Sequence, residues 1–278
     1  MPAQNTGITT YRLNDSQYMK LSKIVYDHGG IHLGDNKKEL VHARLNKVLR
    51  RRGIKGFDDY IRILQDDENG EELVGLLDAI STNVTHFFRE HKHFDFIADN
   101  LAPNVGSDGL KFWSAGCSSG EEPYSLAITL LERFPVPMRQ RYSILATDIS
   151  TKVLQRAVTG LYPMKSVQNL EKQLVRKYFL RGKNDYEGMV KVKKEVAKMV
   201  TFQRLNLIEQ FTFNEGFDAI FCRNVMIYFD TETRQRLIDR YYDALKPGGY
   251  LIIGHSESMN SFKHRFHYIQ PTIYRKEH

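Results

Sequence analysis

Short apolar segments that alternate with helical segments dominate the chain after about Glu90. This alternation is typical of a parallel β-sheet covered by helices. Such a pattern predicts strands over residues 110–114, 143–147, 200–204, 217–222 and 250–254, with two more short strands within 266–275. We therefore expect an α/β fold with a mostly parallel sheet.

The first part of the chain has a different pattern. Residues 11–89 show helical spacing, interrupted by short polar breaks, and contain few strand-like runs. We expect a small all-α domain over residues 1–90 and a larger domain over residues 91–278. Within the larger domain, residues 178–203 combine turn residues with the alternating run VKVK, which indicates an antiparallel β insertion.

Two helix starts can be assigned from capping residues in the larger domain. Ser150 is suited to cap a helix that runs to Val158, because a serine oxygen can accept from the free N–H groups of the first turn. Asp230 or Thr231 can cap a second helix, which we expect to end before the turn residues 246–249.

The net charge of +7 comes from one local stretch. Residues 37–56 contain eight basic residues and one acid, while the rest of the chain is balanced. Val41, Leu45 and Val48 would pack on one face of a helix there, which leaves Arg44 and Lys47 on a neighbouring face. A solvated charged face is one reading; an acidic partner, such as nucleic acid, an anionic membrane or an acidic protein, is the other.

Several protein classes are disfavoured by the composition. The chain has no run of eighteen apolar residues and no apolar region near its amino terminus, so we expect a cytoplasmic protein without membrane insertion. Its two cysteines, Cys117 and Cys222, lie far apart and outside any zinc-type cluster. We therefore expect neither a disulfide nor a bound metal.

The segment FWSAGCSSGEEPYS, residues 112–125, carries the strongest local signal. A predicted strand runs into a loop of small residues, after which a helix begins. Gly116 and Gly120 would let the backbone approach a ligand, yet the segment lacks the glycine patterns of dinucleotide and phosphate-binding loops. Glu121 and Glu122 would repel a pyrophosphate and suit an ammonium or sulfonium group, which favours S-adenosylmethionine.

Polar residues also follow the other predicted strands, where open parallel sheets bind ligands. Asp148 ends the second strand, where it could accept both ribose hydroxyls of an adenosine ligand or cap the following helix. Four further candidates at predicted strand exits are Asn206, Arg223, Asn224 and Tyr228.

Five segments in this order, STNVTHFFRE, WSAGCSSGEEPYS, LATDIS, RLNL and FCRNVMIYFD, closely resemble the chemotaxis receptor glutamate O-methyltransferase family. The resemblance extends over nearly the whole chain. It implies a class I S-adenosylmethionine-dependent methyltransferase fold, which is Rossmann-like, with S-adenosylhomocysteine as the product and no metal. The activity it implies is the formation of glutamate methyl esters on chemotaxis receptors during adaptation.

The resemblance also implies roles for individual residues. It places the cofactor against Asn83, Thr85, Arg89, Ala115, Glu121, Asp148, Asn206, Leu207, Arg223 and Asn224. Arg89 and Tyr228 are expected nearest the transferred methyl group, as catalytic residues. The alternatives are that Arg89 only binds a carboxylate and that Tyr228 only forms a pocket wall.

Two receptor contacts follow from the same resemblance. The receptor's cytoplasmic helices are expected to bind the basic helix, and its carboxyl-terminal peptide would add a strand to the β insertion. The expected substrate-binding residues are Arg44, Lys47, Arg50, Arg51 and Lys55.

Two other functions remain open at this point. A nucleic-acid methyltransferase would also combine a basic domain with this fold, although the chain lacks an aromatic platform for single strands. A non-catalytic adaptor that senses S-adenosylmethionine is the other alternative.

Overall fold

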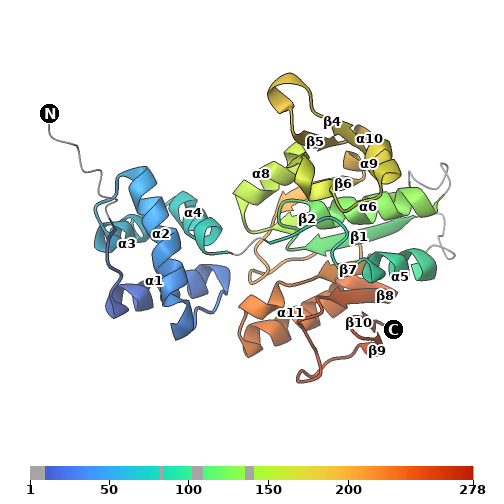
Figure 1. Cartoon of the computed structure of the whole chain (residues 1–278). Helices are drawn as coiled ribbons and strands as arrows, with labels where there is room; N and C mark the ends of the chain where they lie inside the picture. Colours follow the sequence, from blue (N-terminus) through green and yellow to red (C-terminus); the bar gives the residue numbers. More distant parts are fainter. Residues whose placement is uncertain (1–9, 82–83, 102–108, 135–140, 278) are drawn as a thin grey trace. The chain divides into compact units, whose positions relative to one another are not determined.

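The computed structural model describes residues 10–81, 84–101, 109–134 and 141–277 (Figure 1). The chain divides into two compact units, Met1–Thr82 and Asn83–His278. Within the described residues, none of the helices combines the length and the apolar character that crossing a membrane requires.

Residues 10–81 of the first unit form four α-helices: α1 (Asp15–Gly29), α2 (Lys38–Arg52), α3 (Phe57–Gln65) and α4 (Glu71–Ile80), with the 3-10 turn η1 (Asp35–Lys37) before α2. Asn14 and Gln17 form a capping box at the start of α1, in which the side chain of each accepts from the backbone N–H of the other. The expected all-α fold of this region is confirmed.

The core of the first unit forms where the apolar faces of these helices meet. Val41 and Leu45 of α2 are fully buried, as predicted, but the third buried apolar residue is Leu49, and Val48 is only half-buried. Leu49 is four residues beyond Leu45, so it continues the same helical face, whereas Val48 lies at its margin.

The second unit is built on a seven-stranded sheet with the order β6-β2-β1-β7-β8-β10-β9. Its strands are β1 (Leu110–Ala115), β2 (Tyr142–Asp148), β6 (Val200–Arg204), β7 (Phe217–Cys222), β8 (Leu245–Ile253), β9 (His267–Gln270) and β10 (Ile273–Arg275). The first five strands in this order are parallel, and β10 is antiparallel to β8 and β9. The mostly parallel sheet predicted from the sequence is confirmed.

The start of β8 differs from the prediction. Residues 246–249, which we expected to form a turn after the helix, belong to this strand. Phe217 of β7 pairs with Leu245 and Ala219 pairs with Tyr250, so β8 advances by five residues where β7 advances by two. Residues 247–249 therefore form a β-bulge within the strand and not a turn before it.

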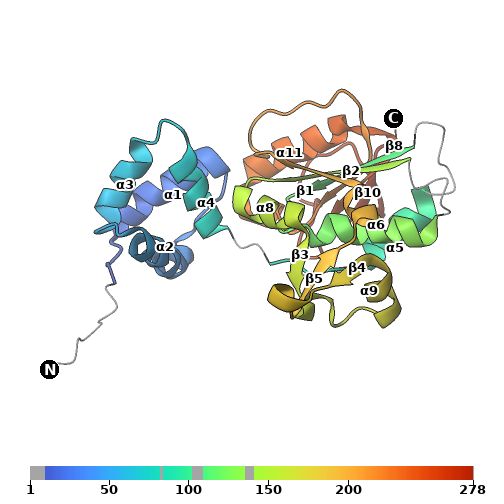
Figure 2. The ribbon, with the colours of Figure 1, turned by 90° about the horizontal axis from the view of Figure 1, so that it is seen from above.

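Helices cover both faces of the main sheet (Figure 2). One face carries α5 (Lys92–Leu101), α6 (Glu121–Arg133) and α8 (Thr151–Thr159), and the other carries α11 (Thr231–Ala244). Adjacent residues of β1 show the alternation: Phe112 joins the core beneath α6, whereas the Trp113 ring lies 5.5 Å from the ring of Tyr241 in α11. The predicted caps, Ser150 for α8 and Asp230 for α11, are confirmed.

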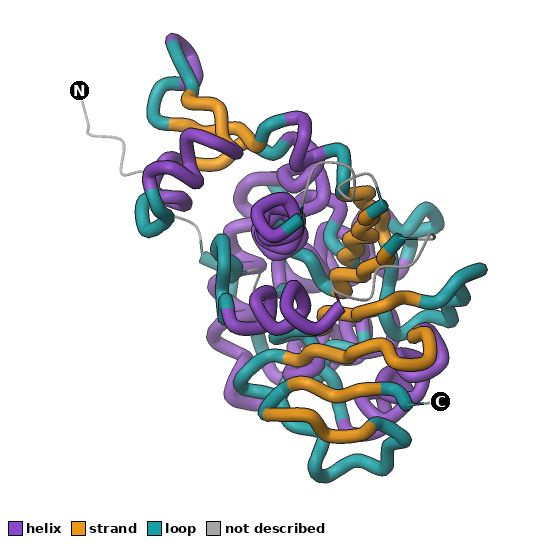
Figure 3. The backbone as a smooth tube through the Cα atoms, turned by 90° about the vertical axis from the view of Figure 1, so that its right-hand side faces the viewer, coloured by secondary structure: helices purple, strands orange, loops and turns teal. Residues whose placement is uncertain are grey.

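A separate antiparallel sheet has the order β3-β5-β4 and forms the expected insertion (Figure 3). Its strands are β3 (Leu161–Pro163), β4 (Phe179–Arg181) and β5 (Met189–Val192). The short helical segments around it are η3 (Met164–Val167), α9 (Lys172–Tyr178), η4 (Asn184–Tyr186) and α10 (Lys194–Ala197). The small sheet thus recruits β3 from upstream of residues 178–203, and residues 200–204 belong to the main sheet.

Tyr162 of β3 attaches the small sheet to the rest of the unit. Its hydroxyl donates to the Ser119 carbonyl at 2.6 Å, and its ring lies 5.0 Å from the ring of Phe87. Phe87 also meets Phe179 of β4 edge-to-face, at 5.2 Å. These contacts join the small sheet to the β1–α6 loop and to the segment that precedes α5.

Candidate active site

The carboxyl ends of β6, β2, β1 and β7 meet at one edge of the main sheet, because these neighbouring strands are parallel. The expected site residues lie along this edge. Ala115 ends β1 and is fully buried, Asp148 ends β2, and Arg223 follows β7. The Leu205 N–H donates to the Asp148 carbonyl at 3.1 Å, which ties the exits of β6 and β2 together.

Asp148 fixes the loop between β1 and α6. Its Oδ2 accepts from the Ser118 N–H at 2.8 Å, and its Oδ1 accepts from the Ser150 N–H at 2.9 Å. Ser118 has a left-handed backbone, with φ at 49°, so this contact stabilises an otherwise unfavourable conformation. The helix-capping alternative for Asp148 is wrong, because the Ser150 side chain caps α8.

The two glycines of the β1–α6 loop are required by packing that could not be seen in the sequence. Gly116 has φ at 84°, and a Cβ there would lie 2.4 Å from Cγ2 of Val225. At Gly120, with φ at 94°, a Cβ would lie 2.8 Å from the Cβ of Ala157. We expected these glycines to admit a ligand, but packing inside the protein already requires both of them.

Glu121 and Glu122 occupy the first turn of α6, where the helix dipole stabilises negative charge. Glu121 Oε2 accepts from the Ser119 hydroxyl at 2.7 Å, and burial raises the pKa of this carboxyl. Glu122 Oε1 accepts from the Ser114 hydroxyl at 2.7 Å. Burial also raises the pKa of Glu122, although the charge of Arg223 opposes this.

Arg223 is the centre of a buried charge cluster. Its side chain is 1% exposed, Nη1 lies 3.0 Å from Glu122 Oε2, and Nη2 lies 3.1 Å from Glu90 Oε2. Nη2 also donates to the Arg89 carbonyl. Burial alone would raise the pKa of Glu90, but Arg223 and His255 together outweigh it, and the pKa falls below the usual range.

Sequence reasoning missed Glu90 as a partner of Arg223, since 133 residues separate the two. Glu122 was noted only as a charge near the cofactor. One general rule could have indicated the pairing: an arginine that directly follows a buried strand needs a carboxylate nearby to balance its charge.

Glu257 was also missed, although it fixes the exit of β7. Its carboxylate accepts from the backbone N–H groups of Asn224 at 2.9 Å, Val225 at 3.0 Å and Gly254 at 2.7 Å. Asn224 is left-handed, with φ at 59°. Burial raises the pKa of Glu257, while the backbone N–H groups of Gly254 and Asn224 oppose the shift.

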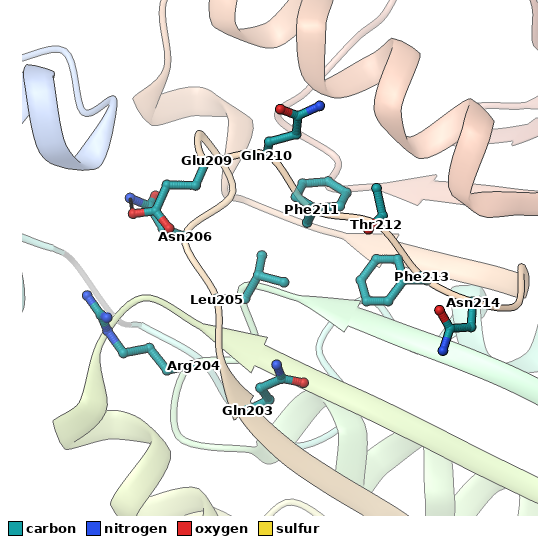
Figure 4. A pocket seen from close by; sticks show the side chains of 10 residues that line it. All are labelled: Gln203, Arg204, Leu205, Asn206, Glu209, Gln210, Phe211, Thr212, Phe213 and Asn214. Carbon is teal, nitrogen blue, oxygen red and sulfur yellow. Dashed lines mark hydrogen bonds between the residues drawn. The ribbon is translucent and has the colours of Figure 1, made fainter.

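Asn206 is one of the residues that line a hollow of about 510 Å³ beside the end of β6 (Figure 4). Its amide donates to Glu209 Oε1 at 3.0 Å, and Figure 4 shows these two side chains next to each other. The rings of Phe211 and Phe213 form an apolar wall of the hollow. Leu207, the next residue after Asn206, is buried.

The remaining residues that we expect to bind the cofactor or to lie nearest the transferred methyl group are all described except Asn83. Asn83 lies outside the described residues, and Thr85 is half-buried in the segment before α5. The Arg89 side chain is 33% exposed, and its Nη1 donates to the Val84 carbonyl at 3.0 Å. Tyr228 is half-buried in the 3-10 turn η5 (Met226–Tyr228).

The basic residues of the first unit do not all face solvent. Lys47, Arg50, Arg51 and Lys55 are exposed, in or just after α2. Arg44 is half-buried, and its Nη1 donates to the carbonyls of Ile80 and Ser81 at the end of α4. The prediction that Arg44 is presented to solvent is therefore wrong, because this guanidinium satisfies carbonyls at the end of a helix.

Comparisons with known proteins cover both units. Residues 16–81 match the family domain described as CheR methyltransferase, all-alpha domain, and residues 83–275 match CheR methyltransferase, SAM binding domain. A chemotaxis protein methyltransferase of Borreliella burgdorferi is 42% identical over 285 residues, which cover 98% of this chain and 99% of that protein. One from Escherichia coli is 40% identical over 263 residues, with 94% and 91% covered. The chain therefore belongs to the CheR family of S-adenosylmethionine-dependent methyltransferases.

Proposed function

We propose that this methyltransferase transfers a methyl group from S-adenosylmethionine to glutamate side chains of chemotaxis receptors, forming methyl esters that serve adaptation. The observation that carries the proposal is the family match over both units. Relatives described as chemotaxis protein methyltransferases align with almost the whole chain, which supports the same substrate class. The reaction would take place in the cytoplasm, on the receptor's cytoplasmic helices.

The charge of the site suits this cofactor. Glu121, Glu122 and Asp148 gather three carboxyl groups at the edge of the sheet. A pyrophosphate would be repelled there, whereas a ligand that carries sulfonium and ammonium groups would be attracted. When bound, S-adenosylmethionine supplies a methyl group that is already electrophilic, so the proposed chemistry needs no metal.

The residues that bind S-adenosylmethionine are proposed from the family resemblance and from their position in the structure. Asp148 would accept the ribose hydroxyls, and Asn206 with Leu207 would contact the adenine. The remaining contacts would come from Asn83, Thr85, Arg89, Ala115, Glu121, Arg223 and Asn224. Because its guanidinium is paired with Glu90 and Glu122, Arg223 would act mainly by fixing the pocket.

The substrate carboxylate needs no strong general base. A glutamate with a pKa of about 4.3 is ionised at neutral pH and can attack directly. The protein's task is then to orient this oxygen and to exclude water, and orientation alone can contribute about 7–11 kcal/mol.

Arg89 is proposed to assist by positioning. One of its five N–H donors is bound to the Val84 carbonyl, so others can make a single contact with a carboxylate oxygen. A bidentate pair with the substrate would reduce its nucleophilicity. Tyr228, in the turn after β7, would line the same pocket near the transferred methyl group.

The exposed basic residues Lys47, Arg50, Arg51 and Lys55 are proposed to bind acidic receptor helices. Arg51→Glu should weaken receptor methylation, and the loss should shrink at high salt because such contacts are screened. Lys20→Glu is the matched control, since Lys20 is an exposed lysine on α1 outside this stretch. Equal effects of the two variants would reject the assignment.

The small sheet is proposed to bind the carboxyl-terminal peptide of receptors by strand addition. β4 lies at one edge of this sheet, and Leu180 within it is 54% exposed. The free peptide should therefore compete with methylation of receptors that carry it. Receptors that lack the peptide should be methylated at a rate that the free peptide does not change.

One assay tests the main proposal. The protein is incubated with methyl-labelled S-adenosylmethionine and either receptor membranes or nucleic acid, and the product is treated with mild base. Release of labelled methanol from the receptors identifies methyl esters and supports the proposal. Base-stable label on nucleic acid, or no transfer to either substrate, would reject it in favour of one of the two alternatives.

Arg89→Ala tests the proposed positioning role within this assay. We expect strongly reduced methylation with an unchanged circular dichroism spectrum and melting temperature. Arg176→Ala, at an exposed arginine of α9, should leave methylation near the wild-type rate. Near-normal turnover of Arg89→Ala would remove Arg89 from the site.

A further inference from the structure

Three possible metal ligands meet beside Arg223 in the second unit. They are Glu90, in the segment before α5, His93 of α5 and His255, in the loop after β8, and their ligand atoms all lie within 4.8 Å of one another. The rings of the two histidines are 5.1 Å apart and nearly perpendicular, with an interplanar angle of 82°. Two imidazoles and a carboxylate thus converge from three separate segments.

The hydroxyl of Thr272 contacts one ring nitrogen of His93. Its Nε2 lies 2.7 Å from the hydroxyl oxygen of Thr272, and that hydroxyl donates its own hydrogen to the Pro271 carbonyl. With its hydrogen directed to Pro271, the Thr272 oxygen can accept from Nε2 of His93, and a proton on Nε2 is the tautomer that a metal ligand at Nδ1 requires. This leaves a lone pair on Nδ1.

That lone pair faces a carboxylate inside the protein. Nδ1 of His93 is buried, has no hydrogen-bond partner among the described residues, and lies 3.5 Å from Oε2 of Glu90. In this tautomer both atoms offer lone pairs, and Nη2 of Arg223, 3.1 Å from the same Glu90 oxygen, contacts only the carboxylate. A zinc ion about 2.1 Å from each atom in tetrahedral geometry would hold them about 3.4 Å apart, close to the observed separation.

The surroundings of His93 resemble those of metal-binding histidines. Such a histidine usually donates its second ring N–H to an oxygen that fixes the ring, as His93 does to Thr272. The positive charge of Arg223 disfavours a second cation, but both Glu90 and Glu122 contact this guanidinium. With both carboxyl groups ionised, they balance the charges of Arg223 and of Arg89, whose Nε lies 3.9 Å from Glu90 Oε1, so the metal ion would be held by the imidazole and carboxylate donors and not by an excess of negative charge.

We propose that Glu90, His93 and His255 form a binding site for a divalent transition-metal ion of the zinc class. Two nitrogens and one oxygen are the donor set of many zinc sites, whereas Mg²⁺ and Ca²⁺ require mainly oxygen ligands. His255 is exposed, so a water molecule can complete the coordination. This site could not be predicted from the sequence, because 165 residues separate Glu90 from His255.

Calorimetry of the full chain tests the proposal directly. After treatment with a chelator, the protein is titrated with Zn²⁺, and we expect one site that Mg²⁺ does not occupy. His255→Ala should abolish this binding while retaining the backbone N–H of residue 255, which lies 3.4 Å from Glu90 Oε1. The matched control is His267→Ala, since His267 is exposed and lies 3.6 Å from the carboxylate of Glu277.

Equal Zn²⁺ binding by the His255→Ala and His267→Ala variants, or no binding by the wild type, would overturn the proposal. A second pair of variants, at Thr272, tests whether Nδ1 of His93 binds the metal ion while all three proposed ligands are kept. Thr272→Val should weaken Zn²⁺ binding about 10- to 100-fold by releasing the ring, and Thr272→Ser should restore it. If Thr272→Val binds as tightly as the wild type, His93 is not a ligand. Neither result depends on methyltransferase activity.

Discussion

Glu257→Gln is the change for which the structure gives the clearest expectation. In the wild-type protein, Oε2 of Glu257 accepts from the N–H groups of Asn224 and Gly254, and Oε1 accepts from that of Val225. A glutamine offers one oxygen and one NH₂ group. If its oxygen takes the position of Oε2, the NH₂ group faces the Val225 N–H, and two donors oppose each other.

The size of the effect follows from these contacts. Losing one hydrogen bond to a charged acceptor costs about 1.5–3 kcal/mol, and the two that remain lose their charge assistance, at about 1 kcal/mol each. Against this, a neutral amide is easier to bury than a carboxylate, and burial does raise the pKa of Glu257. We expect a net loss of about 2–3 kcal/mol, equivalent to about 4–12 °C in melting temperature.

Urea unfolding and thermal melting would measure this loss, and calorimetry would show weaker binding of S-adenosylhomocysteine because the β7 exit loses its anchor. Glu187→Gln, at an exposed glutamate in the turn before β5, is the control for a change of charge alone. If Glu257→Gln stays within about 0.5 kcal/mol of the wild type in stability, the role assigned to these three hydrogen bonds is refuted.

Three further outcomes are expected. Arg223→Met leaves two buried carboxylates without a counter-charge and should cost about 3–5 kcal/mol in urea unfolding at pH 7, with a smaller loss at pH 5. Burial and the charge of Arg223 lower the pKa of His93 from 6.5 to about 3, so its stabilising contribution is complete above pH 6.5 and is lost as the pH falls toward 3. With a chelator present, the free energy of unfolding of the wild type should thus fall by about 1.4 kcal/mol per pH unit in this range relative to that of His93→Gln. Parallel curves of unfolding free energy against pH for the two proteins would contradict the lowered pKa of His93. Gly116→Ala should destabilise the protein by about 1–3 kcal/mol more than Gly188→Ala in thermal unfolding, since both positions have positive φ but only at Gly116 does a Cβ meet Val225.

Features that depend on neighbouring residues could be predicted from the sequence. The strands of the main sheet, the caps Ser150 and Asp230, the position of Asp148 and Arg223 at strand ends and that of Glu121 at the start of a helix all follow from local pattern and from the geometry of a parallel sheet. The family resemblance supplied the nature of the cofactor, which periodicity alone could not.

Features that depend on distant contacts could not be predicted. Arg223 finds Glu90 across 133 positions, and Glu257 finds Asn224 across 33, with no local motif at either end. Arg44 fits a solvent-facing pattern on α2, yet carbonyl groups at the end of α4 bind its guanidinium. In each case a buried polar group needs a partner, and only the tertiary structure decides which residue provides it.

The attachment of the small sheet through Tyr162 limits how this protein can be re-engineered. A graft that exchanges the whole sheet for another docking module would delete the hydroxyl that holds the Ser119 carbonyl, as well as the ring that packs on Phe87. The exchange should therefore keep Leu161–Pro163 and Phe179 and replace only the hairpin beyond them. Specificity could then be redesigned at the periphery without loosening the β1–α6 loop at the sheet edge.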